Sequence, residues 1–229
     1  MYKRSSWAFN QQVAEEFDKH VRQSVPQYEE LQEMIAQLSD FFVQIHSVVY
    51  DLGCGTGETI QKINNRHENK RLQFVGVDNS VDMLMKAQVK NKESEQFQWV
   101  NQSLESFEFL SPTPLVLSIL TLQFLNKQHR RGLLEKIYKQ LEIGGAFILV
   151  EKVLAKDSAI QDIFSQSYHD FKEVNGFSAQ EILMKDKSLR GVLNPLHQKE
   201  MEELLLSVGF KTIEVFHKTW NFVGWIAIK

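Results

Sequence analysis

The sequence contains a single cysteine, Cys54, and lacks both a long apolar run and a marked excess of one charge. One cysteine cannot form a disulfide within the chain, so we expect a reducing compartment. No apolar run is long enough to span a bilayer, and the N-terminus has no signal-like apolar core. We therefore expect a cytoplasmic protein with no membrane partner.

The formal net charge of −3 gives no basic surface, so direct binding of nucleic acid is not expected. Histidine, cysteine and acidic residues are also not spaced as metal ligands usually are, so we expect no metal. The 229 residues are 43% hydrophobic and 24% charged, which is typical of a soluble globular protein. This length suits a single domain, which we expect to span residues 1–229.

The most informative stretch covers residues 48–57, where an apolar run gives way to glycines at alternate positions, Gly53, Gly55 and Gly57. Glycine lets the backbone turn sharply and lets a ligand approach closely. The helical pattern that follows would point backbone N–H groups at that ligand. A second strand ends at Asp78, whose carboxylate is placed to accept both hydroxyls of a ribose. The alternative role for Asp78 is a helix N-cap.

Strand and helix patterns alternate through the rest of the chain. We expect strands at residues 48–52, 73–78, 97–101, 115–120, 146–150, 211–216 and 220–228, and helices at 58–65, 82–91, 127–141 and 197–207. Gly144 and Gly145 are expected to close the helix before the fifth strand. This order predicts an α/β fold with a doubly wound, seven-stranded, mostly parallel sheet. Residues 1–47 add a helical cap interrupted at Pro26, and residues 153–193 add a helical insertion after strand five.

The even glycine spacing, with Asp51 at the end of the first strand, resembles the Rossmann-like class I S-adenosylmethionine-dependent methyltransferases. Dinucleotide dehydrogenases have G-x-G-x-x-G instead. Asp78, residues 122–124 after the fourth strand and the glycine pair at 144–145 agree with the methyltransferase pattern. The resemblance implies S-adenosylmethionine or S-adenosylhomocysteine as cofactor, with its methionine portion across residues 53–55.

Beyond this core, the chain resembles the carboxy-S-adenosylmethionine synthase family nearly end to end. The matching stretches are residues 13–15 with Phe17, 24–26 with Tyr28, 50–54, 78–80, 121–125, 136–138, 169–172 with 175–178, and 221–222. The match in the insertion is the most specific, because ordinary methyltransferases need no such segment. That family makes carboxy-S-adenosylmethionine from S-adenosylmethionine and prephenate, for later modification of the tRNA wobble uridine. The resemblance also implies a homodimer with the inserted helices at its interface.

The residues predicted to bind the cofactor come partly from the glycine pattern and partly from this resemblance. They are Tyr28, Asp51, Gly53, Cys54, Gly55, Asp78, Asn79, Ser103, Leu104 and Ile119. From spacing alone, Tyr28 is a core aromatic residue, and Cys54 is not expected to act as a nucleophile. The family's asparagine at the end of strand four is Ile119 here, and its aspartate after strand three is Ser103.

A third departure bears on the reaction. The family's arginine in the insertion, which holds the carboxylate of the carboxylated cofactor, aligns with Asp186, between Lys185 and Lys187. An aspartate in a pocket of low dielectric repels a carboxylate unless it is neutralised. Either a neighbouring lysine replaces the arginine as a point charge, or the pocket no longer prefers the carboxylated cofactor.

Three functions remain open, and the lost arginine favours the first of them. The first is a methyltransferase that uses S-adenosylmethionine and acts on a small molecule, and the second is a carboxy-S-adenosylmethionine synthase with a rearranged carboxylate site. The third is a cofactor-binding module without turnover. No catalytic base can be named. His169 and Asp170 line either the acceptor pocket or a dimer interface, Glu151 faces the site or pairs with Lys152 or a helix end, and His197 begins a helix.

Overall fold

The computed structural model describes residues 9–91 and 94–229, and within them seven strands form one sheet in the order β3-β2-β1-β4-β5-β7-β6. The strands are β1 (Val48–Leu52), β2 (Gln73–Asp78), β3 (Phe97–Asn101), β4 (Thr113–Ile119), β5 (Leu141–Lys152), β6 (Thr212–Thr219) and β7 (Phe222–Ile228). Strands β1 to β5 are parallel, and β7 pairs antiparallel with both β5 and β6. The expected sheet with an antiparallel edge is confirmed.

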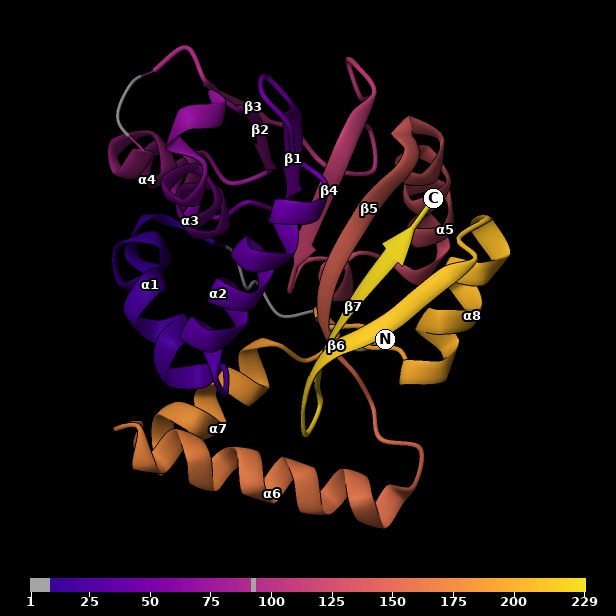
Figure 1. Ribbon diagram of the computed structural model, residues 1–229. Coiled ribbons are helices and arrows are strands. Elements are labelled where there is room, and N and C mark those ends of the chain that lie inside the picture. The colour runs from indigo at the N-terminus through magenta and orange to yellow at the C-terminus, as the bar shows by residue number, and fades with distance from the viewer. Residues whose placement is uncertain (1–8, 92–93) are drawn as a thin grey trace.

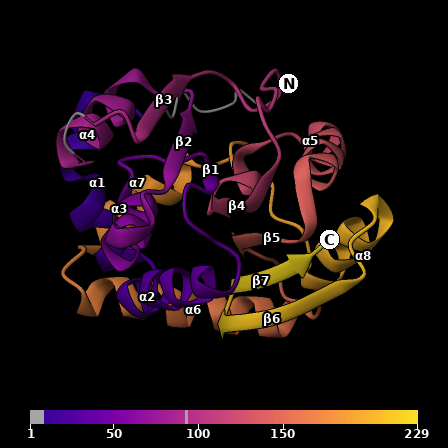
Figure 2. The same ribbon diagram turned by 45° about the horizontal axis from the view of Figure 1, so that its top comes forward.

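Helices cover both faces of this sheet (Figure 1, Figure 2). On one face, α5 (Lys127–Gln140) and α8 (Gln198–Val208) pack on β1, β2, β4, β5 and β7. On the other, α2 (Tyr28–Leu38), α3 (Glu58–Arg66) and α4 (Val81–Asn91) complete the second half of the core. Because β4 is covered on both faces, its residues from Thr113 to Ser118 are all buried, which explains its nearly unbroken apolar sequence.

Three further helices gather beyond the end of the sheet where β4 and β5 finish (Figure 1). These are α1 (Gln11–Ser24) from the expected cap, and α6 (Ser158–Val174) and α7 (Ala179–Ser188) from the expected insertion. Short 3-10 turns complete the fold at η1 (Ser39–Phe41), η2 (Glu68–Lys70) and η3 (Leu122–Phe124). Between α1 and α2, Val25 is extended and Gln27 is left-handed, which is the break expected at Pro26.

Strand β5 differs from the expected strand because it begins at Leu141, five residues early. Leu141 pairs with Thr113 of β4, so the backbone is already extended where the helix was expected to finish. Gly144 and Gly145 exchange backbone hydrogen bonds of 3.0 Å with Lys229 at the chain's last residue, and Gly144 has a φ of +80°. The prediction that the glycine pair closes α5 is therefore wrong, since the pair lies within the strand.

Candidate functional site

The glycine turn after β1 forms the centre of the candidate site. Gly53, Gly55 and Gly57 have φ values of +78°, +53° and +73°, a region that residues with a Cβ rarely adopt. The N–H groups of Gly53 and Cys54 donate to the carbonyl of Val77, at 2.7 and 3.1 Å, which holds the turn against the end of β2. The first strand, the turn and the helix expected after it are thus confirmed.

Asp78 lies directly beside this turn. Its Oδ2 accepts a 3.0 Å hydrogen bond from the N–H of Gly55, and its Oδ1 accepts one of 2.9 Å from the N–H of Ser80. Burial raises the pKa of the carboxyl, although these hydrogen bonds oppose the rise. Each carboxylate oxygen can accept more than one hydrogen bond, so Asp78 can still receive the hydroxyls of a ribose.

A second carboxyl, that of Asp51, is buried beneath the turn. Burial, followed by the charge of Asp78, raises the pKa of Asp51 to about 7. Cys54 is also buried, and burial raises the pKa of its thiol well above the usual value. Its Sγ lies against Gly76 of β2, so the thiol fills a packing space and is a poor nucleophile.

Other residues that were predicted to bind the cofactor lie at the same carboxyl end of the parallel strands. Asn79 is exposed beside Asp78, and the backbone after β3 reaches this position through a 3.0 Å hydrogen bond from Gln102 N–H to the carbonyl of Asp78. Ser103 is exposed, and its Oγ accepts from the N–H of Glu105 in a turn. Leu104 is buried in the core, so its side chain packs under this edge.

The end of β4 closes the other side of the turn. Thr121 fills the space that a Cβ on Gly53 would need, and its Oγ1 donates to the carbonyls of Gly53, at 3.3 Å, and Ile119, at 3.1 Å. Between them, Leu120 has a φ of +58°, an unfavourable conformation for leucine that the paired strands impose. Ile119 therefore lies at the edge where the resemblance puts it, with an apolar side chain instead of an amide.

Helix α1 packs over the glycine turn. The ring of Phe17 lies 3.6 Å from where a Cβ on Gly55 would stand. Asp18 fixes this cover, because it accepts hydrogen bonds of 2.5 Å from Thr56 Oγ1 and from Lys90 Nζ. Phe17 also packs in a cluster with Tyr28, which is buried at the start of α2. Tyr28 is thus a core aromatic residue. It packs in the same cluster as Phe17, whose ring lies against the glycine turn.

These residues fit the adenosyl and methionine parts of S-adenosylmethionine. Gly53 and Gly55 keep the turn free of side chains, Asp78 offers its carboxylate to a ribose, and Asp51 adds a buried carboxyl under a cationic ligand. When bound, that cofactor supplies an activated carbon on its sulfonium. The chain's own part is to orient it and to cover it with α1.

Comparison with known proteins agrees with this geometry. A model of the methyltransferase domain matches residues 49–145. The chain is 38% identical over all its 229 residues to the carboxy-S-adenosyl-L-methionine synthase of Staphylococcus epidermidis and covers 99% of that protein. It is 38% identical over 226 residues to the enzyme of that name from Methylococcus capsulatus, with 97% of this chain and 93% of the relative covered. The chain belongs to the carboxy-S-adenosylmethionine synthase family.

Solved structures show the same fold at lower identity. Human N-acetylserotonin methyltransferase, in complex with S-adenosylmethionine, superposes with a TM-score of 0.62 at 16% identity and covers 96% of this chain and 56% of that one. The protein is therefore an S-adenosylmethionine-dependent transferase with a Rossmann-like class I methyltransferase fold, and its cofactor is S-adenosylmethionine or S-adenosylhomocysteine.

A group of buried and half-buried lysines was not predicted as a group. We name Lys152, Lys172 and Lys185 the lysine cluster. Lys152 ends β5 and Lys172 lies on α6, and the ammonium of each is 4.4 Å from the centroid of the Tyr168 ring. Tyr168 packs against the apolar cluster that contains Tyr28 and Phe17, so the lysines lie on the side of the molecule where α1 covers the glycine turn.

The lysine cluster has unusual electrostatics. Burial, followed by the charge of Lys172, lowers the pKa of Lys152 to about 8 and that of Lys185 on α7 to about 8. His20 of α1 faces the same charges, and burial together with Lys185 and Lys172 lowers its pKa to about 4. Ammonium groups held together out of water are stabilised by an anion, so the cluster is suited to an anionic ligand.

Asp186, which the resemblance aligns with the family's arginine, contacts two side chains of α6. Its Oδ2 lies 2.9 Å from Nε2 of His169, and its Oδ1 lies 3.7 Å from Nζ of Lys172. His169 thus contacts α7 of its own chain, whereas Asp170 is exposed. Of the two lysines that flank Asp186, Lys185 is half-buried in the cluster and Lys187 is exposed.

Two other polar residues have structural roles. Glu151 is buried, and its Oε1 accepts a 2.9 Å hydrogen bond from the N–H of Leu122, so it stabilises the turn η3. Burial raises its pKa to about 8, although the charge of Arg130 opposes the rise. His197 is the N-cap of α8, as expected, and its N–H donates to Glu200 Oε2 at 2.7 Å.

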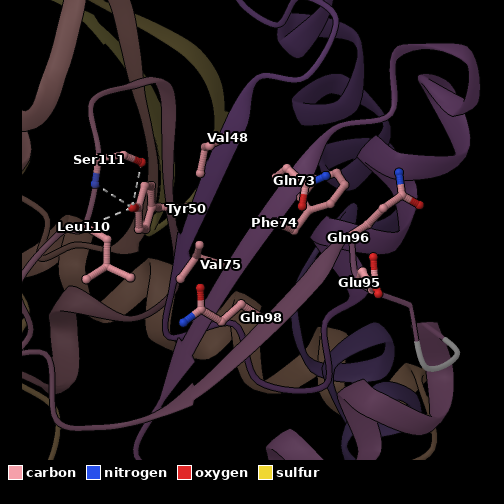
Figure 3. A pocket seen from close by; sticks show the side chains of 10 residues that line it. All are labelled: Val48, Tyr50, Gln73, Phe74, Val75, Glu95, Gln96, Gln98, Leu110 and Ser111. Atoms are coloured by element: carbon pink, nitrogen blue, oxygen red, sulfur yellow. Dashed lines mark hydrogen bonds between the residues drawn. The ribbon is translucent and has the colours of Figure 1, made fainter.

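A hollow of about 270 Å³ lies at the opposite, amino end of the parallel strands (Figure 3). Tyr50 and Val75 line it together with Gln73, Gln98 and Ser111, far along the strands from the glycine turn. It is therefore separate from the candidate site. Within residues 9–91 and 94–229, no three acidic, histidine or cysteine side chains are grouped to hold a metal, and no helix is long and apolar enough to cross a membrane.

Proposed function

We propose that the protein is a carboxy-S-adenosylmethionine synthase, in which the lysine cluster binds the carboxylate of a co-substrate such as prephenate. The observation that carries this proposal is the position of Lys152 and Lys172, which share the Tyr168 ring at the edge where β4 and β5 end. A methyltransferase with a neutral acceptor gains nothing from buried ammonium groups there. A carboxylate stabilises them.

The neutralisation of Asp186 supports the same function. With His169 and Lys172 within 2.9 and 3.7 Å, its carboxylate is paired and does not repel a bound anion as an isolated aspartate would. Lys185 and Lys152 then take the part that an arginine plays in the resembling family, as point charges rather than as a planar fork. The product would serve a later modification of the tRNA wobble uridine.

The test is to incubate the purified protein with S-adenosylmethionine and prephenate and to look for carboxy-S-adenosylmethionine by mass spectrometry. Lys152→Met should lose this product by about tenfold to a hundredfold while retaining affinity for S-adenosylmethionine, because a hydrogen bond to a charged group is worth about 1.5–3 kcal/mol. Lys187→Met is the matched control, since Lys187 is exposed on the same helix as Lys185. Bound cofactor with no carboxylated product from the wild-type protein would contradict the proposal.

Methyl transfer to a small molecule is the second candidate, and the missing arginine at position 186 favours it. It predicts that the wild-type protein forms S-adenosylhomocysteine with a small carboxylic acid as methyl acceptor and makes no carboxylated cofactor from prephenate. Tight cofactor binding without either product would instead leave a binding module without turnover.

We also propose a cytoplasmic homodimer that does not bind nucleic acid directly. The outer surfaces of α6 and α7 support the dimer, because they expose apolar residues that a partner copy could cover, namely Ile160, Ile163, Val174, Leu183 and Met184. Sedimentation equilibrium should give a dimer for the wild-type protein and a monomer for Ile163→Asp. A wild-type monomer at all concentrations would rule this assembly out.

A further inference from the structure

Asp186 of α7 contacts two side chains of α6, His169 and Lys172. His169 and Lys172 are three residues apart and therefore share one face of that helix. The side chain of Asp186 is 42% exposed, whereas that of Lys172 is 6% exposed. The carboxylate thus extends from the surface to an ammonium that is almost fully removed from water.

Lys172 shares the ring of Tyr168 with Lys152 and acts electrostatically on the groups around it. Its charge lowers the pKa of Lys152, of Lys185 and of His20, so each of these three groups lies close enough to sense it. Asp186 acts in the opposite direction. Its charge raises the pKa of Lys172 and of Lys152, against the effect of burial.

We propose that Asp186 is a positioning residue, which holds Lys172 over the ring of Tyr168 and fixes the charge that the lysine cluster presents to an anion. The inference rests on the proposed function, because the charge of the cluster matters to the reaction only if an anionic co-substrate binds there. Asp186 would therefore influence the ligand through Lys172, whereas the arginine of the resembling family holds the ligand itself.

Groups from four elements surround Lys172 and decide its titration. They are Lys152 from β5, Tyr168 and His169 from α6, Lys185 and Asp186 from α7, and His20 from α1. Without the charge of Asp186, burial acts on Lys172 with no carboxylate contact to offset it. Lys172 should then release its proton at a lower pH.

The titration of Lys172 tests this directly and does not depend on turnover. We would follow the NMR signals of ¹³C-labelled lysine side chains with pH, and assign the Lys172 signal by its loss in Lys172→Met. In Asp186→Asn the midpoint of Lys172 should fall by about one pH unit, which corresponds to a partly exposed ion pair. Asp186→Glu should restore the wild-type midpoint. Asp170→Asn, an exposed change on α6, should leave it unchanged.

Prephenate binding in the same variants separates the two proposals. If both proposals hold, prephenate affinity is lost at alkaline pH with a measurable midpoint. That midpoint should fall in Asp186→Asn by the same amount as the midpoint of Lys172, and it should return to the wild-type value in Asp186→Glu. An unchanged Lys172 midpoint in Asp186→Asn would overturn the role of Asp186. A shifted midpoint, with no prephenate binding by the wild-type protein, would support the role of Asp186 and contradict the proposed co-substrate.

Discussion

Asp51→Asn should stabilise the ligand-free protein at neutral pH and above while weakening its affinity for S-adenosylmethionine. The side chain of Asp51 is buried under the glycine turn, and both burial and the charge of Asp78 raise its pKa from 3.8 to about 7. An ionised carboxylate in this position costs free energy. Asparagine has nearly the same shape and carries no charge.

The sign and the size of this change in the free energy of unfolding follow from proton linkage. Between about pH 4 and pH 7 the folded protein keeps the proton of Asp51 while the unfolded chain has released it, so the free energy of unfolding falls as the pH rises through this range. A shift of about 3 pKa units at about 1.36 kcal/mol each gives a loss of up to ~4 kcal/mol. Asp51→Asn avoids this loss, so its advantage should be near zero at about pH 4 and greatest above about pH 7.

Urea unfolding followed by tryptophan fluorescence at several pH values measures this difference. Asp170→Asn controls for a general change of charge, because Asp170 is exposed. Calorimetry with S-adenosylmethionine, a cationic ligand, should show an affinity about tenfold lower for Asp51→Asn, or ~1.4 kcal/mol. A free energy of unfolding with the same pH dependence in both proteins would refute the argument from the buried charge. Equal affinities would remove Asp51 from the cofactor site.

Three further changes test other parts of the site. Asp78→Ala should weaken cofactor binding by ~1–3 kcal/mol in calorimetry through the lost hydrogen bonds to ribose, and unchanged affinity would remove Asp78 from the site. Gly53→Ala should lower the free energy of unfolding by ~1–3 kcal/mol, because the new Cβ overlaps Thr121 at a φ of +78°, whereas Gly132→Ala, on open helix surface, should not destabilise. Asp186→Arg should raise the preference for carboxy-S-adenosylmethionine over S-adenosylmethionine in competition binding, and the same preference as in the wild-type protein would contradict the alignment.

The sheet and the cofactor edge could be predicted because local rules determine them. Alternate glycines after a buried strand, followed by an acid at the end of the next strand, predict a turn beside a carboxylate, and Gly55 and Asp78 make this contact. The parallel order of the strands then brings Ile119 and Asn79 to the same edge. The resemblance contributed Tyr28 and the residues after β3, which spacing alone could not assign to a ligand.

The error at Gly144 has a physical cause. A glycine pair after a helical pattern usually ends the helix, but the pairing of Leu141 with Thr113 extends the backbone three residues earlier. That pairing joins residues far apart in the sequence, so local patterns do not reveal it. Tertiary pairing overrides local preference here.

The lysine cluster was missed for a related reason. Lys152, Lys172 and Lys185 belong to three different elements, and each alone looks like an ordinary surface lysine. One sequence signal was present, since Tyr168 and Lys172 are four residues apart and thus share a face of α6. It shows only that a ring and an ammonium meet. That Lys152 approaches the same ring depends on how the insertion folds back over the end of β5.

The substitution at position 186 shows why the charge of one residue does not determine the chemistry of a site. Read alone, aspartate in place of arginine reverses the charge and argues against a bound carboxylate. In the fold, Asp186 contacts His169 and Lys172, and its charge raises the pKa of Lys172 against the effect of burial. Because Lys172 offsets the charge of Asp186, the carboxylate is not an unpaired negative charge beside Lys152 and Lys185. The same substitution can therefore preserve carboxylate binding.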